Sequence, residues 1–125
     1  MSYTLNTESR GAYLYITVTG ENSLETVRDY LSEVHEICLR YQCPDVLIVE
    51  NLSGPSLNTL VIYDLVSRKS AQAAHVIGRM AYVDINPEHN FKAMEFAEDV
   101  AVNRGVMVRV FSNIPEAEQW LLSQQ

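Results

Sequence analysis

The sequence predicts a single α/β domain built on one mostly parallel sheet, and three observations support that prediction. The chain has 125 residues, which is the length of one ordinary domain. Its composition, 47% hydrophobic and 20% charged, is that of a folded globular protein. Segments with the two-residue period of strands alternate with segments of helical period, and this alternation forces parallel neighbours joined by right-handed crossovers. We therefore expect one domain over residues 1–125 in the order ββαβαβαβα, with five strands, four helices and an antiparallel first strand at the edge.

The first elements form a predicted β-hairpin. Apolar and polar side chains alternate over residues 3–7 and 12–19, and Ser9-Arg10-Gly11 is the turn between them. The first strand is short and polar, which suits the edge of a sheet. Tyr13 and Tyr15 lie on the face opposite the aliphatic residues of the second strand. They either pack beneath a covering helix or form an aromatic patch for a partner chain.

A long amphipathic helix follows the hairpin. Apolar residues recur at steps of three and four from Leu24 to Tyr41, which is one face of a helix. Asn22 followed by Glu25 has the spacing of an N-terminal capping box. Pro44 marks the end of the segment.

The rest of the chain continues the alternation of strands and helices. Residues 45–49 form a continuous apolar run, typical of a central parallel strand covered on both faces, and residues 50–56 have the composition of a loop. The remaining elements are helices over residues 57–74, over 91–104 and from Asn113 onward, and strands over residues 79–84 and 106–111.

Charge and cysteine content restrict the classes of partner. The formal net charge of −7 argues against nucleic acid and anionic membrane surfaces, because both require a basic footprint. No apolar run is long enough to span a bilayer, and the first residues do not have the pattern of a signal peptide. Two cysteines are too few for a disulfide framework or a zinc site. We expect a cytoplasmic protein without membrane insertion.

Two loops at the carboxyl ends of the predicted parallel strands are candidate ligand sites, because ligands of open α/β sheets bind at that edge. In the first loop, Ser53, Ser56 and Asn58 lie near a helix start, where they are candidates to hold a phosphate. Capping of the helix by Ser56 is the simpler interpretation. The chain has no glycine-rich nucleotide loop, and we predict no cofactor.

The second loop contains Asp84, Asn86, Glu88 and His89. An acid–base pair or a metal site would use such residues, but their spacing matches no metal-binding motif and no third ligand converges on them. Solvated loop residues are the simpler interpretation. The sequence therefore assigns no catalytic residue and no metal ligand.

Three stretches carry a resemblance to a known family. They are Val46 to Gly54, Arg79 to Val83, and the block from Asn103 to Leu121 that contains Val108-Arg109-Val110-Phe111. Together with the element order they resemble the STAS family of sulphate transporters and anti-sigma-factor antagonists, and above all its small stand-alone bacterial members of unassigned function. Classical antagonists carry an Asp-Ser pair at the helix after the third strand, and its Ser is the phosphorylation switch. The matching positions are Asn58 and Thr59, so this resemblance makes Thr59 a candidate phospho-site without the acidic neighbour.

Three functions remain open. The leading hypothesis is a non-catalytic regulatory or interaction module that acts through protein contacts or small-ligand sensing. The alternatives are a carrier of an apolar small molecule or lipid in an internal pocket, and an enzyme that uses the strand-end loops, for which the sequence offers no positive sign. Leu5, Tyr13 and Tyr15 form the candidate interface for a homodimer or another protein partner, because an edge strand leaves unpaired backbone groups. A monomer with a solvated edge is the alternative.

Overall fold

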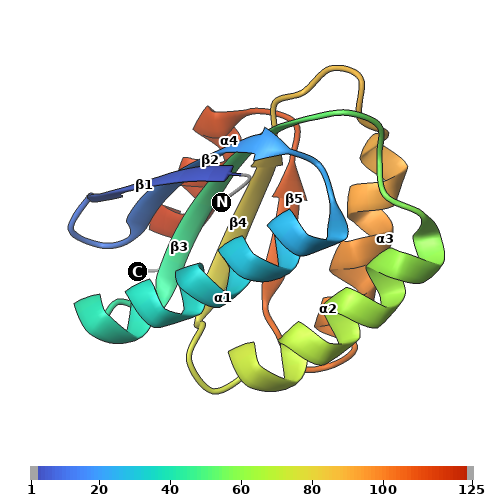
Figure 1. Cartoon of the computed structure of the whole chain (residues 1–125). Helices are drawn as coiled ribbons and strands as arrows, with labels where there is room; N and C mark the ends of the chain where they lie inside the picture. The colour runs from blue at the N-terminus through green and yellow to red at the C-terminus, as the bar shows by residue number, and fades with distance from the viewer. Residues whose placement is uncertain (1–2, 124–125) are drawn as a thin grey trace.

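The computed structural model describes residues 3–123 and confirms the predicted order of elements (Figure 1). The strands are β1 (Tyr3–Ser9), β2 (Leu14–Glu21), β3 (Asp45–Ser53), β4 (Arg79–Asp84) and β5 (Val108–Phe111). The helices are α1 (Leu24–Tyr41), α2 (Thr59–Ala73), α3 (Phe91–Val102) and α4 (Ile114–Ser123).

The five strands form one sheet in the order β1-β2-β3-β4-β5. β1 pairs with β2 in antiparallel orientation, and the other neighbours are parallel, as the sequence predicted. β3 lies in the centre, where Ile48 and Val49 are buried, while Leu5 lies on the edge strand opposite Val18. The apolar run of β3 therefore occupies the position that its composition indicated.

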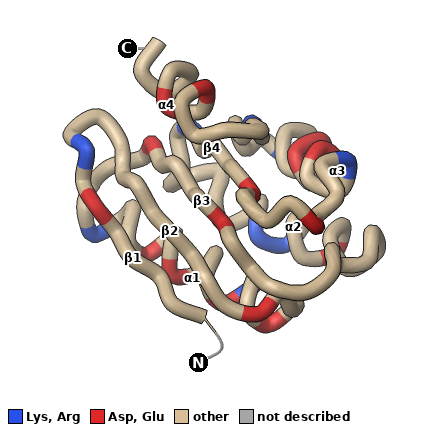
Figure 2. The backbone as a smooth tube through the Cα atoms, turned by 90° about the horizontal axis from the view of Figure 1, so that it is seen from above, with Lys and Arg blue, Asp and Glu red and all other residues tan. Residues whose placement is uncertain are grey.

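The helices are divided unequally between the two faces of the sheet. α1, α2 and α3 cover one face and α4 covers the other (Figure 1), and the view from above places α1 and α4 on opposite sides of the strands (Figure 2). The two-residue period of β3 follows this division. Val46 and Ile48 belong to the core under α1, whereas Leu47 and Val49 pack with Ala117 of α4. Among residues 3–123, no helix combines the length and apolar character needed to cross a bilayer.

The first helix differs from its prediction in two details. The N-cap is Ser23, whose hydroxyl accepts a hydrogen bond from the Thr26 backbone N–H at 3.1 Å, and not Asn22. The most deeply buried face is rotated from the predicted stripe: Tyr30 is fully buried, whereas Leu24 and Tyr41 are largely exposed. The helix begins one residue later than the capping box implied and buries an aromatic residue that the apolar stripe omitted.

The third strand is longer than its apolar run. β3 continues to Ser53, through residues that the sequence placed in a loop, because β2 pairs with it as far as Glu21 opposite Ser53. Pairing to a long neighbour thus extends a strand into a polar sequence. The extension places Glu50 inside the fold, and Figure 2 shows acidic positions on β3 and β4 among the surrounding elements.

Candidate functional site

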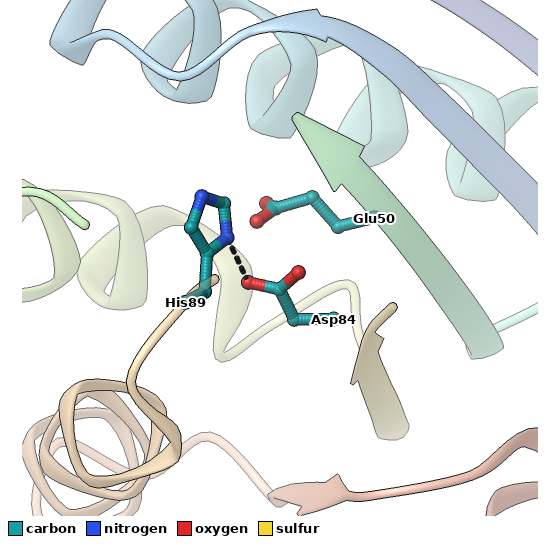
Figure 3. A group of neighbouring side chains, drawn as sticks. All are labelled: Glu50, Asp84 and His89. Atoms are coloured by element: carbon teal, nitrogen blue, oxygen red, sulfur yellow. Dashed lines mark hydrogen bonds and ion pairs between the residues drawn. The ribbon is translucent and has the colours of Figure 1, made fainter. Parts of the chain in front are cut away.

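A buried polar cluster lies at the carboxyl ends of β3 and β4. It consists of Tyr30 from α1, Glu50 from β3, Tyr82 and Asp84 from β4, and His89 from the loop before α3. Glu50 is only 4% exposed, and the side chains of Asp84 and His89 are 6% and 3% exposed. The three ionisable side chains point toward one another (Figure 3).

Glu50 lies at the centre of the cluster. Its Oε2 atom accepts hydrogen bonds from the hydroxyls of Tyr30 and Tyr82, and these hydroxyls lie 3.0 Å apart. Burial raises the pKa of Glu50 to about 7, against the opposing effect of the two tyrosine hydrogen bonds. A carboxyl group with a pKa near neutrality is unusual in proteins as a whole. Such shifted pKa values are concentrated in functional sites.

His89 forms the second half of the cluster. Its Nδ1 atom lies 2.6 Å from Asp84 Oδ2, and its Nε2 atom lies 2.7 Å from the carbonyl oxygen of Gly54. Burial lowers the pKa of His89, but the hydrogen bonds to Asp84 and to the Gly54 carbonyl outweigh it, so that the pKa is raised. The Asn86 side chain donates a 2.7 Å hydrogen bond to the Leu52 carbonyl and so ties this loop to the end of β3.

A cavity of about 180 Å³ borders the cluster, between the sheet and the three helices α1, α2 and α3. Its walls are mainly apolar and include Leu65, Ile77, Met80, Met94 and Ala97. Glu50, Tyr82, Asp84 and His89 also line it. An engineered apolar cavity of roughly 150 Å³ binds benzene or xenon, so this cavity has the size of a single-ring molecule.

The first predicted loop does not form a convergent site. Asn58, and not Ser56, caps α2: its Oδ1 atom accepts a hydrogen bond from the Leu60 N–H at 2.7 Å. The Ser56 hydroxyl instead accepts from the Asn90 N–H at 3.1 Å, and the Ser53 hydroxyl donates to the Gly20 carbonyl at 3.1 Å. Thr59 is exposed at the first position of α2. The side chains of Ser53, Ser56 and Asn58 thus make three separate contacts, and of the three Ser56 also lines the cavity described above.

The second predicted loop contributes to the buried cluster, and the interpretation of its residues as solvated is wrong for Asp84 and His89, whose side chains are buried. Of the four residues predicted in this loop, Glu88 alone is exposed. Asn86 N–H donates to Asp84 Oδ1 at 3.0 Å, and the turn that results folds His89 back over the strand ends. The expectation that no third residue converges on them is also wrong, because Glu50 lies beside Asp84 and His89. The signal for Glu50 was the two-residue period that continues from Val46 and Ile48 past the apolar run.

Of the three residues predicted to form an interface on the hairpin, the structure removes Tyr13. Tyr13 is 4% exposed and donates its hydroxyl to Glu118 of α4, so it is a core residue beneath a helix and not part of an aromatic patch. Tyr15 is half-buried, with the Arg10 guanidinium 4.1 Å from its ring centre. Leu5 is half-buried on the edge strand. Leu5 and Tyr15 therefore remain candidates for the interface predicted on the hairpin.

Comparison with known proteins bears on the fold. No protein-family model and no curated protein sequence matches the chain. The structure is similar to the crystal structure of an anti-sigma factor antagonist from Mycobacterium paratuberculosis, with a TM-score of 0.57 and 13% sequence identity, over 97% of this chain and 95% of that one. The fold is STAS-like. In this STAS-like domain the buried cluster lies at the strand edge from which the chain leads into α2 and α3.

Proposed function

We propose that the protein is a STAS-like regulatory interaction module whose contacts with a protein partner respond to a small molecule in the cavity. The observation that carries this proposal is an apolar, ring-sized cavity bordered by a buried carboxyl group. Ligand sites are typically apolar cavities with a few well-placed polar groups that fix the orientation of the ligand.

The chemistry of the cavity defines the class of ligand. Apolar walls favour a compact ring, and Glu50 offers a carboxyl group to a hydroxyl, amine or ring N–H of the ligand. Oε2 of Glu50 is occupied by two tyrosine hydroxyls, which leaves Oε1 for this contact. A volume of about 180 Å³ suits a ring-sized molecule better than the long acyl chain of a lipid.

Helix α2 connects the cavity with the outer surface. Leu65 and Ile62 line the cavity, whereas Leu60 is 78% exposed and Tyr63 is 47% exposed. These two side chains lie about one turn apart on the helix, and we propose them as part of the surface that contacts the protein partner. A ligand that shifts α2 would change this surface. The similarity to an anti-sigma factor antagonist supports a protein partner, and the free thiols Cys38 and Cys43 support a cytoplasmic location.

Ligand occupancy takes the regulatory role that phosphorylation has in classical STAS antagonists. Asn58 is engaged as the cap of α2, and it stands immediately before Thr59 where the classical antagonists have an acidic residue. We therefore expect that Thr59 and Ser56 are not efficient kinase substrates.

Native mass spectrometry of protein purified under non-denaturing conditions tests the proposal. The wild type is compared with Ala97→Phe, which fills the cavity, and with Ala71→Phe, which places the same side chain on an exposed position of α2. We expect a bound small mass in the wild type and in Ala71→Phe that is lost in Ala97→Phe. An identical mass in all three proteins, or none in the wild type after exposure to cell extract, contradicts ligand binding in this cavity.

A carrier of a small apolar molecule is the second candidate, because the same cavity serves it. A photo-crosslinking side chain at Leu60 separates the two functions in cells. A crosslinked protein whose yield changes at least threefold in the Ala97→Phe background supports the regulatory module. A bound ligand in the absence of any crosslinked protein supports the carrier function.

A further inference from the structure

We infer that Glu50, Asp84 and His89 form a binding site for a divalent first-row transition-metal ion. One ligand atom from each residue lies within 4.8 Å of the other two, and the three side chains converge in Figure 3. Carboxylate oxygen and imidazole nitrogen are both ligands of such ions. This inference does not depend on the proposed function.

The hydrogen bonds of His89 indicate which nitrogen faces the ion. Nε2 lies 2.7 Å from the carbonyl oxygen of Gly54, an acceptor that requires a proton on Nε2. Nδ1 then points into the cluster, 2.6 Å from Asp84 Oδ2. Metal-binding histidines usually donate the remote N–H to a backbone carbonyl or carboxylate, which fixes the ring and the tautomer. Gly54 supplies this contact from outside the triad.

The two carboxylates are held in the same way. Oε2 of Glu50 accepts hydrogen bonds from two tyrosine hydroxyls, and Oδ1 of Asp84 accepts one from the Asn86 backbone N–H. Each contact engages one oxygen and orients the other. Glu50 Oε1, Asp84 Oδ2 and His89 Nδ1 would thus converge on an ion, which takes the place of the proton between Asp84 and His89 and, when bound, occupies the Glu50 oxygen otherwise offered to a cavity ligand. Support of each ligand by a separate outer group is the arrangement that metal sites share.

The charge of the cluster also favours a cation. Glu50 and Asp84 are neighbouring acids with little solvent access, and burial of a charged group is costly unless a partner neutralises it. Within residues 3–123, no Lys or Arg forms an ion pair with either carboxylate, and His89, itself a member of the cluster, is the basic side chain paired with Asp84. A divalent ion would neutralise both. All three residues line the cavity. The coordination positions of the ion that they do not occupy would therefore face water or a ligand in the cavity.

Titration of the chelator-treated full chain with Zn²⁺, in competition with a chromophoric chelator, tests the site. We expect one equivalent to bind, and His89→Gln, Asp84→Asn and Glu50→Gln each to weaken binding at least tenfold. Glu88→Gln is the matched control, because Glu88 is an exposed acid of the same loop, and it should bind as the wild type does. Equal affinity in the wild type and in the Glu50 and Asp84 variants, or no stoichiometric binding, would overturn the inference.

A second measurement uses only the wild type and so does not depend on the folding of any variant. Nitrogen-15 spectra of the His side chains report each ring nitrogen separately. We expect Zn²⁺ to shift Nδ1 of His89, while Nε2 keeps its proton toward Gly54. A response confined to His35 or His75, or a thiolate charge-transfer band when Co²⁺ replaces Zn²⁺, would assign the metal elsewhere and refute the site.

Discussion

Glu50 should make the metal-free protein less stable as the pH rises from about 4.5 to about 7. Burial raises the pKa of this carboxyl group from 4.5 to about 7, so the folded protein holds the proton more tightly than the unfolded chain does. The stabilisation that results is fully present below pH 4.5. It is lost as the pH rises through the folded value, because both states are then ionised and only the folded one buries the charge.

The expected loss follows from the two pKa values. They differ by about 2.5, and each pKa unit corresponds to about 1.36 kcal/mol, so the free energy of unfolding should fall by about 3 kcal/mol. Glu50 is almost completely buried, so solvent screens little of this effect. The raised pKa of His89 acts in the same direction above pH 6.5. Subtraction of the Glu50→Gln variant therefore isolates the contribution of Glu50.

Urea unfolding between pH 4 and pH 8, with chelator present, measures this contribution. The difference in unfolding free energy between the wild type and Glu50→Gln should fall by about 3 kcal/mol over that range. Glu88→Gln, which changes an exposed acid, should run parallel to the wild type. A wild-type minus Glu50→Gln difference that stays constant within about 1 kcal/mol would refute the assignment of a raised pKa to Glu50.

The other expectations concern packing, thiol reactivity and association. Trp120→Ala should lower the free energy of unfolding, measured with denaturant, by about 2 kcal/mol. This is less than for a wholly buried tryptophan, because the ring is half-buried against the sheet, and a loss below about 0.5 kcal/mol contradicts this packing. Burial raises the pKa of Cys38 to about 12. In a Cys43→Ser background, Cys38 should therefore resist iodoacetamide at mildly alkaline pH until the protein unfolds, and rapid labelling of the folded protein would contradict the burial of this thiol. We expect the wild type to associate through β1 at micromolar concentration in sedimentation experiments and Leu5→Lys or Tyr15→Lys to weaken this association; a wild type that is monomeric throughout rules it out.

The fold could be predicted from the sequence because its signals are local. The two-residue period of the hairpin strands and the bounds of β4 follow from the alternation of apolar and polar side chains within a few neighbouring residues. α3 ends at Val102, two residues before the predicted end, and Gly105 adopts a φ of +89° in the turn that follows, a conformation that a residue without Cβ adopts readily. Asn113 accepts a hydrogen bond from the Glu116 N–H at 3.0 Å, as its cap position implied.

The site could not be predicted because its contacts join distant segments. Tyr30 and Glu50 meet across 20 positions of sequence, and His89 reaches Gly54 across 35. Glu50 follows an apolar run in a stretch with the composition of a loop, and the strand continues through it because it pairs with Val18 of β2 and Asp84 of β4. The polarity of residues 86–90 correctly predicted a loop, but it gave no sign that His89 folds inward.

Titration of the isotope-labelled wild type with indole, phenol and benzylamine tests ligand binding in the cavity most directly. Amide correlation spectra should show saturable shifts at residues that line the cavity, such as Leu65, Ile77 and Ala97, for at least one of these probes. Residues of α4, on the opposite face of the sheet, should not shift, and Ala97→Phe should abolish the response while Ala71→Phe preserves it. Shifts that do not saturate, or that persist in Ala97→Phe, would contradict the account.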